Sequence, residues 1–257
     1  MTGVEISPLN VKDVAYLLVD GYWQVSVVDE IDSTQNFLKM KRPNHGEVIA
    51  AEFQSAGRGR LNRTFEANKS RSLLFSFYYK PEVDRESWGW IPLVAGMAVT
   101  NILNKDKNIF VTKWPNDVLV LHSNNSEETK KVAGVLVEVH SEGVIIGIGI
   151  NVGMQKEELP VDTATSLAIE GLTQLDRNQL LADVLNEFAR LVAQWESGFD
   201  LAPSYCETSS TIGRKVKVDG VDGASRSGRA TGVGLNGELL LEGDQAIYSG
   251  DVIHLYT

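Results

Sequence analysis

The sequence predicts an α+β protein, with a mixed or antiparallel β-sheet packed with helices and a small all-β unit after it. Two observations lead to this class. Up to residue 194, short apolar strand patterns alternate with segments of helical spacing. Beyond Pro203 the chain contains only short strand patterns separated by glycine turns, with no helical signal. We therefore expect a first domain over residues 1–209 and a second over residues 210–257.

The first part of the chain alternates between the two kinds of element. Residues 1–20 are expected to form one short helix or to remain an arm. An alternating pattern predicts a strand over 22–30, and Asp32 or Ser33 can cap the helix that follows it. Further strands are expected at 47–53 and 72–79, and a helix capped by Ser87 is expected to run to about Leu103.

Four strands are expected close together in the middle of the chain, at 109–113, 117–121, 133–140 and 143–151. The last two read as a hairpin that turns through Ser141, Glu142 and Gly143. The polar run 122–131 has the composition of a loop tip. An apolar stripe predicts the clearest helix over 176–194, and Gly198 ends it.

Composition excludes several classes of protein. The 257 residues are 43% hydrophobic and carry a net charge of −10, so a general nucleic-acid binder is not expected. The single cysteine, Cys206, excludes an intramolecular disulfide and a Cys-rich zinc site. The N-terminus lacks the features of a signal peptide, and no apolar run is long enough to span a membrane. We expect a cytoplasmic protein without a membrane partner.

The stretch EFQSAGRGRLNRTF, residues 52–65, is the strongest local signal. Gly57 and Gly59 allow the backbone to approach a ligand closely, and the arginines between and after them offer planar forks of donors for carboxylate or phosphate. These arginines are Arg58, Arg60 and Arg63. The pattern predicts an anion site. Taken alone, it is also compatible with a solvated basic turn or a nucleic-acid contact.

Other polar groups also flank predicted strands. They are IDST (31–34), KWPND (113–117), KVAG (131–134) and GIGIN (147–151). Together with QSAGRGRLNRTF, these strings in this order resemble the signatures of the biotin–protein ligases, over most of residues 25–155. The resemblance implies a class II synthetase-like catalytic domain, and the C-terminal unit is similar to the family's SH3-like β-barrel. The lipoate and octanoate ligases, which share the fold, are the alternative.

The resemblance implies a reaction in two steps. Biotin and ATP give biotinyl-5′-AMP with Mg²⁺, and a lysine of a biotin carboxyl carrier protein, as in acetyl-CoA carboxylase, then takes the biotin. Neither step needs a nucleophile from the enzyme, so catalysis rests on positioning and charge stabilisation. About twenty residues precede the first strand, too few for the winged-helix domain of some members. We therefore expect a ligase that binds no operator DNA, as a monomer or a homodimer.

The resemblance also assigns residues to the two substrates. Biotin needs an apolar slot with a few placed polar groups. Its implied contacts are Ser33, Thr34, Gln35, Gln54, Gly57, Arg58, Gly59, Arg60, Lys131 and Gly134. The implied nucleotide contacts are Arg58, Arg60, Arg63, Phe65, Lys113, Asn116, Lys131 and Asn151. The family commonly has Asn after the threonine, where this chain has Gln35, so the role of Gln35 stays open.

Three residues are expected to act in catalysis. Lys131 would lie on the carboxylate and α-phosphate oxygens while negative charge shifts between them. Arg60 would help to hold these two anions together. Asp117 would orient the acceptor lysine, accept its proton, or hold Mg²⁺ on the phosphates. The sequence leaves these three roles of Asp117 open.

Overall fold

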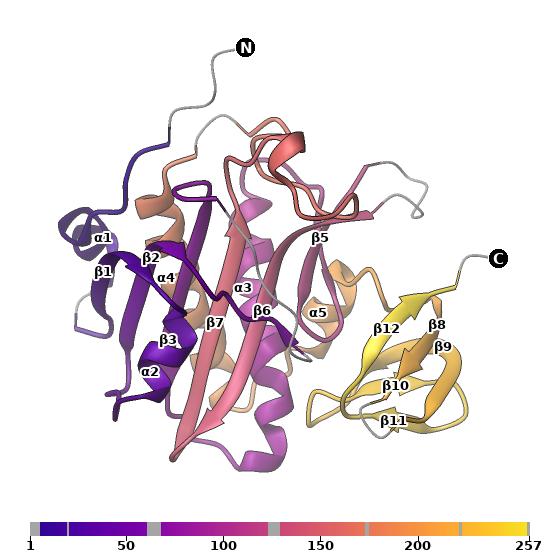
Figure 1. Cartoon of the computed structure of the whole chain (residues 1–257). Helices are drawn as coiled ribbons and strands as arrows, with labels where there is room; N and C mark the ends of the chain where they lie inside the picture. Colours follow the sequence, from indigo (N-terminus) through magenta and orange to yellow (C-terminus); the bar gives the residue numbers. More distant parts are fainter. Residues whose placement is uncertain are drawn as a thin grey trace.

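A seven-stranded mixed sheet forms the larger part of the computed structural model, which describes residues 6–19, 21–60, 68–122, 129–172, 175–220 and 223–255 (Figure 1). The strand order is β1-β2-β3-β7-β6-β5-β4. β1 and β2 are parallel, and every other neighbouring pair is antiparallel. The strands are β1 (Gln24–Ile31), β2 (Glu47–Gln54), β3 (Ser72–Tyr79), β4 (Phe110–Lys113), β5 (Asp117–Leu121), β6 (Thr129–His140) and β7 (Gly143–Asn151).

Helices cover the sheet unequally. α3 (Trp90–Leu103) lies against β4, β5 and β6, and it also contacts α4 (Arg177–Glu196) and α5 (Ala202–Thr208) (Figure 1). The short α2 (Thr34–Lys39) lies on the other face, over β3 and β7. α1 (Val11–Leu17) packs against α4 and β1. The 3₁₀ helices η2 (Arg85–Gly89) and η3 (Lys156–Glu158) lie in connections.

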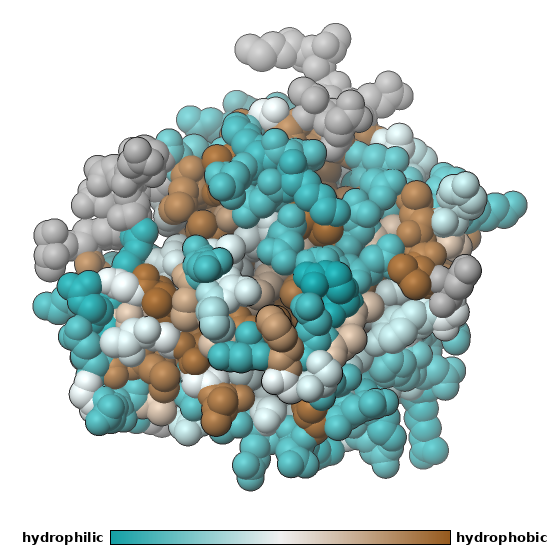
Figure 2. Space-filling view, turned by 180° about the vertical axis from the view of Figure 1, so that it is seen from behind, coloured by the Kyte–Doolittle hydropathy of each residue, from teal (hydrophilic) through white to brown (hydrophobic). Residues whose placement is uncertain are grey.

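The core lies on both faces of β3, which explains the nearly continuous apolar sequence of that strand. All eight residues of β3 are buried. Phe75 and Phe77 face the main cluster with α3 and α4, while Tyr78 joins Leu38 and Ile145 in a small cluster under α2. Viewed from behind, the surface carries its hydrophobic residues in small separate groups among hydrophilic ones (Figure 2). Among the described helices, none is both long and apolar enough to cross a membrane.

A five-stranded antiparallel sheet follows α5, in the order β11-β10-β9-β8-β12. Two buried tryptophans of the larger part connect to it. The indole of Trp114 donates to the carbonyl of Gly237 at 3.1 Å, and the indole of Trp90 donates to the carbonyl of Gly234 at 3.1 Å. The strands are β8 (Lys215–Asp219), β9 (Ser225–Val233), β10 (Leu239–Leu241), β11 (Gln245–Ile247) and β12 (Asp251–His254).

A buried ion pair ties the N-terminal segment to the sheet. Arg177, at the start of α4, is fully buried, and its Nη2 lies 2.7 Å from Glu52 Oε2 on β2. Glu52 also accepts from the backbone N–H of Leu9 at 2.6 Å and from the Ser70 hydroxyl at 2.7 Å. Burial alone would raise the pKa of the Glu52 carboxyl, but these hydrogen bonds and the arginine hold it below its ordinary value.

Most predicted elements are confirmed, with three corrections. Ser87 does not cap the long helix, because it lies in η2, and α3 begins at Trp90 after Gly89 without a side-chain cap. β6 starts at Thr129 rather than at Ala133, because its first residues pair with β5 inside the expected loop. The region around Pro203 was expected to lack helix, whereas α5 occupies it. For the N-terminus, the structure selects the short helix.

Candidate active site

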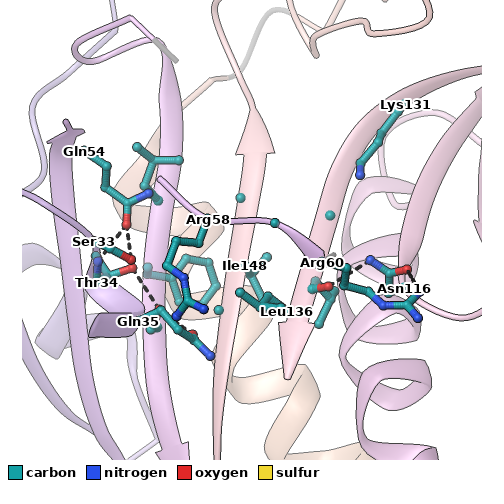
Figure 3. A pocket seen from close by; sticks show the side chains of 18 residues that line it. Ser33, Thr34, Gln35, Gln54, Arg58, Arg60, Asn116, Lys131, Leu136 and Ile148 are labelled. Atoms are coloured by element: carbon teal, nitrogen blue, oxygen red, sulfur yellow. Dashed lines mark hydrogen bonds between the residues drawn. The ribbon is translucent and has the colours of Figure 1, made fainter. Parts of the chain in front are cut away.

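A pocket opens on the face of the sheet that carries α2 (Figure 3). β3, β7 and β6 form its floor, and the N-terminal end of α2 forms one wall. Residues 55–60, called the strap below, cross in front of the floor from β2 toward the second sheet (Figure 1). The pocket holds about 500 Å³ of space free of protein atoms, part of it open to solvent. Apolar floor residues and polar rim residues give it the character of a small-molecule site.

Glycines on the floor make room for two functional side chains. A Cβ atom on Gly147 would lie 2.6 Å from Gln35 Oε1 and 3.2 Å from Ser76 Oγ. A Cβ atom on Gly134 would lie 3.0 Å from both Cε and Nζ of Lys131. The glycines of GIGIN and KVAG are therefore needed for close approach of side chains rather than for an unusual backbone conformation.

The polar wall at α2 is a connected hydrogen-bond network. Ser33 caps α2 through the backbone N–H of Asn36, as the capping prediction required. Gln54 Oε1 accepts from the backbone N–H of Thr34 at 2.7 Å and from its hydroxyl at 2.9 Å. The Thr34 hydroxyl lies 2.8 Å from Ser76 Oγ, and Ser76 donates to Gln35 at 3.2 Å. These links fix the groups before a ligand arrives, so little ordering is needed on binding.

Gln35, whose role the sequence left open, is part of this wall. Its side chain is buried, and its amide donates to the carbonyl of Ile145 at 3.1 Å. The amide nitrogen of Gln54 has no hydrogen-bond partner among the described residues, and Gln54 lines the pocket. A polar ligand edge can therefore use this donor.

The strap is fastened at both ends. Near β2, the backbone N–H groups of Ser55 and Ala56 donate to the carbonyls of Ile31 and Asp32. At the other end, Arg60 Nη1 donates to Asn116 Oδ1 at 2.9 Å, and the guanidinium reaches the carbonyl of Gly250 at 3.4 Å.

Contacts of Arg60 thus join the strap, the WPND turn and the second sheet. Arg60 Nη1 also lies 3.9 Å from Asp251 Oδ1 at the start of β12. Asn116 in turn donates to the carbonyl of Val135 on the floor at 2.9 Å. The peptide bond between Trp114 and Pro115 in the same turn is cis.

Between its ends, the strap carries Arg58 over the pocket wall. Arg58 Nη1 and Nη2 contact the two carboxylate oxygens of Glu138 at 3.0 and 3.3 Å, and Nη1 also donates to Asn36. Lys39 Nζ lies 2.8 Å from the same carboxylate. Burial would raise the pKa of Glu138, but hydrogen bonds from Lys39 and Gln35 and the charge of Arg58 hold that pKa below its ordinary value.

Lys131 lines the far end of the pocket, with its ammonium group 2.7 Å from Asp117 Oδ1 (Figure 3). Its backbone is held by residues 163 and 165 rather than by pairing with β7. The N–H of Lys131 donates to the carbonyl of Thr163 at 2.8 Å, and its carbonyl accepts from the N–H of Thr165 at 2.9 Å. The buried hydroxyl of Thr165 donates to the buried Glu170. A rigid backbone therefore carries the flexible lysine side chain into the site.

Most of the sequence-predicted residues meet at this pocket. Those that line it are Ser33, Thr34, Gln35, Gln54, Arg58, Gly59, Arg60, Asn116, Lys131 and Gly134. Asp117 joins them through Lys131, and it lines a neighbouring cleft with Lys113, Asp219 and Asp251. Gly57 and Asn151 lie outside the pocket lining, and Asn151 donates to the carbonyl of Thr165. Arg63 and Phe65 lie outside the described residues.

Three site residues were not predicted from the sequence. Ser76 is the one polar residue inside the apolar run LLFSFYY, and that interruption is the signal that could have found it. Asn36 and Glu138 both bind Arg58, and Glu138 also accepts a hydrogen bond from Gln35. Glu138 stands alone in the apolar stretch VLVEV, which is the corresponding signal in β6.

Comparison with known proteins agrees with this geometry. The model of the biotin/lipoate A/B protein ligase family matches residues 27–155, which span just over half of the chain. The chain belongs to this family. Among the curated family members, the biotin–[acetyl-CoA-carboxylase] ligase of Mycobacterium tuberculosis is 34% identical over 91% of this chain and 90% of its own length. The bifunctional ligase/repressor BirA of Escherichia coli is 30% identical over 94% of this chain and 76% of its own length.

A solved structure in the family has the same fold. The biotin protein ligase of Aquifex aeolicus, in complex with biotin and ATP, superposes with a TM-score of 0.77 at 31% identity, over 91% of this chain and 99% of that one. The biotin protein ligase of Leishmania major, at 20% identity and a TM-score of 0.60, shows the fold alone. The predicted α+β class is thereby confirmed, and the predicted family membership is confirmed as well.

Proposed function

We propose that this protein is a biotin–[acetyl-CoA-carboxylase] ligase, which joins biotin to ATP as biotinyl-5′-AMP and then to a lysine of a biotin carboxyl carrier domain. The observation that carries the proposal is the arrangement of one pocket: an apolar floor, a hydrogen-bonded amide wall at one end, and three cations, with Arg58 over the wall and Arg60 and Lys131 toward the other end. The relatives named as biotin ligases support this choice of substrate.

The two ends of the pocket suit the two parts of the reaction. The network of Thr34, Gln35 and Gln54 offers donors and acceptors to the polar ureido edge of biotin, and Leu74, Leu136 and Ile148 surround its apolar ring. The carboxylate would then extend toward the cations. There a carboxylate and a phosphate must approach each other against their repulsion, and charge-assisted hydrogen bonds offset that cost by roughly 1.5–3 kcal/mol each.

Lys131 and Asp117 carry the chemistry in this proposal. The Lys131 ammonium would stabilise the charge that develops on the carboxylate and phosphate oxygens, which are in place only during transfer. Asp117 would accept the proton of the acceptor lysine, which must be neutral to attack the acyl-adenylate. Its carboxylate borders the cleft beside the second sheet, where an acceptor lysine can approach.

Magnesium fits the same end of the site. Mg²⁺ in nucleotide sites is usually held by one or two carboxylates together with substrate phosphates. Asp117 supplies such a carboxylate beside Lys131, so the donor set suits an ion that arrives with ATP. When bound, the ion supplies neutralisation of phosphate charge.

The remaining assignments follow from the layout. Lys113 and Asn116, on either side of the Trp114-Pro115 bond, are proposed to contact the nucleotide or the acceptor. Arg63, Phe65, Gly57 and Asn151 keep the roles that the resemblance implies, as proposals. Residues 1–209 are proposed as the catalytic domain, and residues 210–257, which contain the second sheet, as an SH3-like barrel. We also propose that the chain binds no operator DNA.

A direct assay tests the function. The whole chain is incubated with ATP, Mg²⁺ and a biotin carboxyl carrier domain, and biotin transfer is measured by mass spectrometry. Lipoate and octanoate are run in parallel, because the family model also covers lipoate ligases. A mass increase corresponding to biotin is the expected result. Transfer of lipoate or octanoate without transfer of biotin would assign the other substrate class.

A further inference from the structure

The guanidinium of Arg58 is held on one edge and open on the other. Its Nη1 donates to Asn36 Oδ1 and to Glu138 Oε2, each at 3.0 Å, and its Nη2 donates to Glu138 Oε1 at 3.3 Å. These contacts use three of the five N–H groups of an arginine. The Nε–H and the second Nη2–H have no partner among the described residues. These two lie side by side, in the fork geometry that binds a carboxylate or phosphate through two parallel hydrogen bonds.

Charge decides whether this open fork can attract an anion. An isolated pair of Arg58 and Glu138 would be neutral. Lys39 Nζ lies 2.8 Å from Glu138 Oε1, so the three side chains together carry a formal charge of +1. Their side chains are only 22–36% exposed, and their field is therefore less screened than that of surface charges.

We propose that Glu138 is a positioning residue that aligns Arg58, so that the open fork of the guanidinium receives an oxyanion of the substrate. Asn36 fixes the remaining rotation of the guanidinium. Lys39 keeps the net charge of the cluster of Arg58, Glu138 and Lys39 positive. The oxyanion is the carboxylate of biotin or a phosphate of the nucleotide. The inference rests on the proposed function, because it requires one of these ligands in the pocket.

The competing explanation is that Glu138 merely anchors the strap. The strap has other fastenings, since Ser55 and Ala56 donate to the backbone of residues 31 and 32, and Arg60 binds Asn116. An anchor alone would affect all ligands of the pocket to the same degree. An alignment device would affect only the ligand whose anion meets the fork. Ligand selectivity therefore separates the two explanations.

The test is calorimetric titration of the whole chain with biotin, with its neutral alcohol analogue biotinol, and with ATP. The variant Glu138→Gln keeps the shape of the side chain and removes its charge. The control is Glu142→Gln, at an exposed glutamate in the turn between β6 and β7 that pairs with Lys80. We expect Glu138→Gln to weaken the affinity for one anionic ligand about tenfold, since a charge-assisted hydrogen bond is lost.

The pattern of affinities identifies the anion. Weaker binding of biotin with unchanged binding of biotinol assigns the fork to the carboxylate, and weaker binding of ATP alone assigns it to a phosphate. Equal weakening of biotin and biotinol, or affinities that match those of Glu142→Gln, would overturn the inference. A wild-type chain that binds no biotin would instead overturn the proposed function.

Two further variants keep the inference testable if Glu138→Gln does not fold. Lys39→Met leaves Glu138 in place and removes the compensating charge, so the same ligand should bind about threefold more weakly at low salt, with the difference fading at high salt. In an Arg58→Ala background, Glu138→Gln should cause no further loss of affinity. An unchanged affinity in Lys39→Met, or an additional tenfold loss in the Arg58→Ala background, would contradict the alignment role.

Discussion

Replacing Gly147 by alanine should damage the pocket by displacing Gln35. The new Cβ would lie 2.6 Å from Gln35 Oε1, whereas ordinary contacts begin at 3.4 Å, so the amide must shift by about 0.8 Å (3.4 − 2.6). That shift stretches the hydrogen bonds from Ser76 and to the carbonyl of Ile145, now 3.2 and 3.1 Å long. Each neutral hydrogen bond contributes about 1 kcal/mol. Alanine returns about 0.5 kcal/mol by restricting the unfolded chain. The net loss in the free energy of unfolding is about 1.5 kcal/mol.

Urea denaturation, followed by tryptophan fluorescence, measures this loss. Gly232→Ala is the matched control, because Gly232 also lies in a strand but has no atom within 4 Å of the position that a Cβ atom would occupy. The control should be neutral or slightly stabilising. Biotin affinity, measured in the same samples, should fall only in Gly147→Ala. If Gly147→Ala and Gly232→Ala unfold at the same urea concentration and bind biotin equally, close approach is not the reason for this glycine.

Three further changes probe other parts of the molecule. Lys131→Met should lower the rate of ATP–pyrophosphate exchange about 10²–10³-fold while biotin still binds, since it removes one preorganised cation; an unchanged exchange rate would remove Lys131 from the mechanism. Arg60→Ala should speed dissociation of biotinyl-5′-AMP at least about tenfold, measured by stopped-flow fluorescence, because its links to Asn116 and Gly250 are lost; an unchanged rate would exclude this clamp. Glu52→Gln should lower the free energy of unfolding by about 3–5 kcal/mol at neutral pH, because it leaves the buried Arg177 uncompensated. The folded-state pKa of Glu52 lies below its unfolded value, so the wild-type stability contributed by this group is present above the unfolded pKa and is lost as the pH falls through the folded one. Denaturant titrations from neutral to acidic pH should therefore bring wild type and Glu52→Gln closer together, and a constant difference would refute the pairing as its source.

The sequence predicted those elements whose signals are local. β3 begins and ends where the apolar run does, and Ser33 caps α2 as its residue type suggests. Ser87 does not cap the long helix, because tertiary packing outweighs the preference of serine for the N-cap position. The turn before α3 forms η2 instead, and the apolar residues that follow start the α-helix at Trp90.

The site was predictable only in part, because some of its residues are far apart in the sequence and are brought together by strand pairing. Arg58 stands out in the sequence as a cation between two glycines, and Lys131 as the lysine that begins the KVAG string. Glu138 lies 80 residues from Arg58, and only the pairing of β6 with β7, and of β7 with β3, brings it under the strap. Thr165, which holds the backbone of Lys131, carries no ligand-like pattern of its own.

The fastening of Arg60 to the second sheet makes the lifetime of a reactive intermediate depend on a part of the molecule that supplies none of the pocket floor. Regions of a protein open separately, each with its own free energy. If the second sheet separates from the first, Arg60 loses the carbonyl of Gly250 and Trp114 loses the carbonyl of Gly237, while β3, β7 and β6 remain paired. The rate at which an acyl-adenylate is lost to hydrolysis would then follow the rate at which the second sheet opens. Hydrogen exchange at the Trp114 indole would report the rate of that opening.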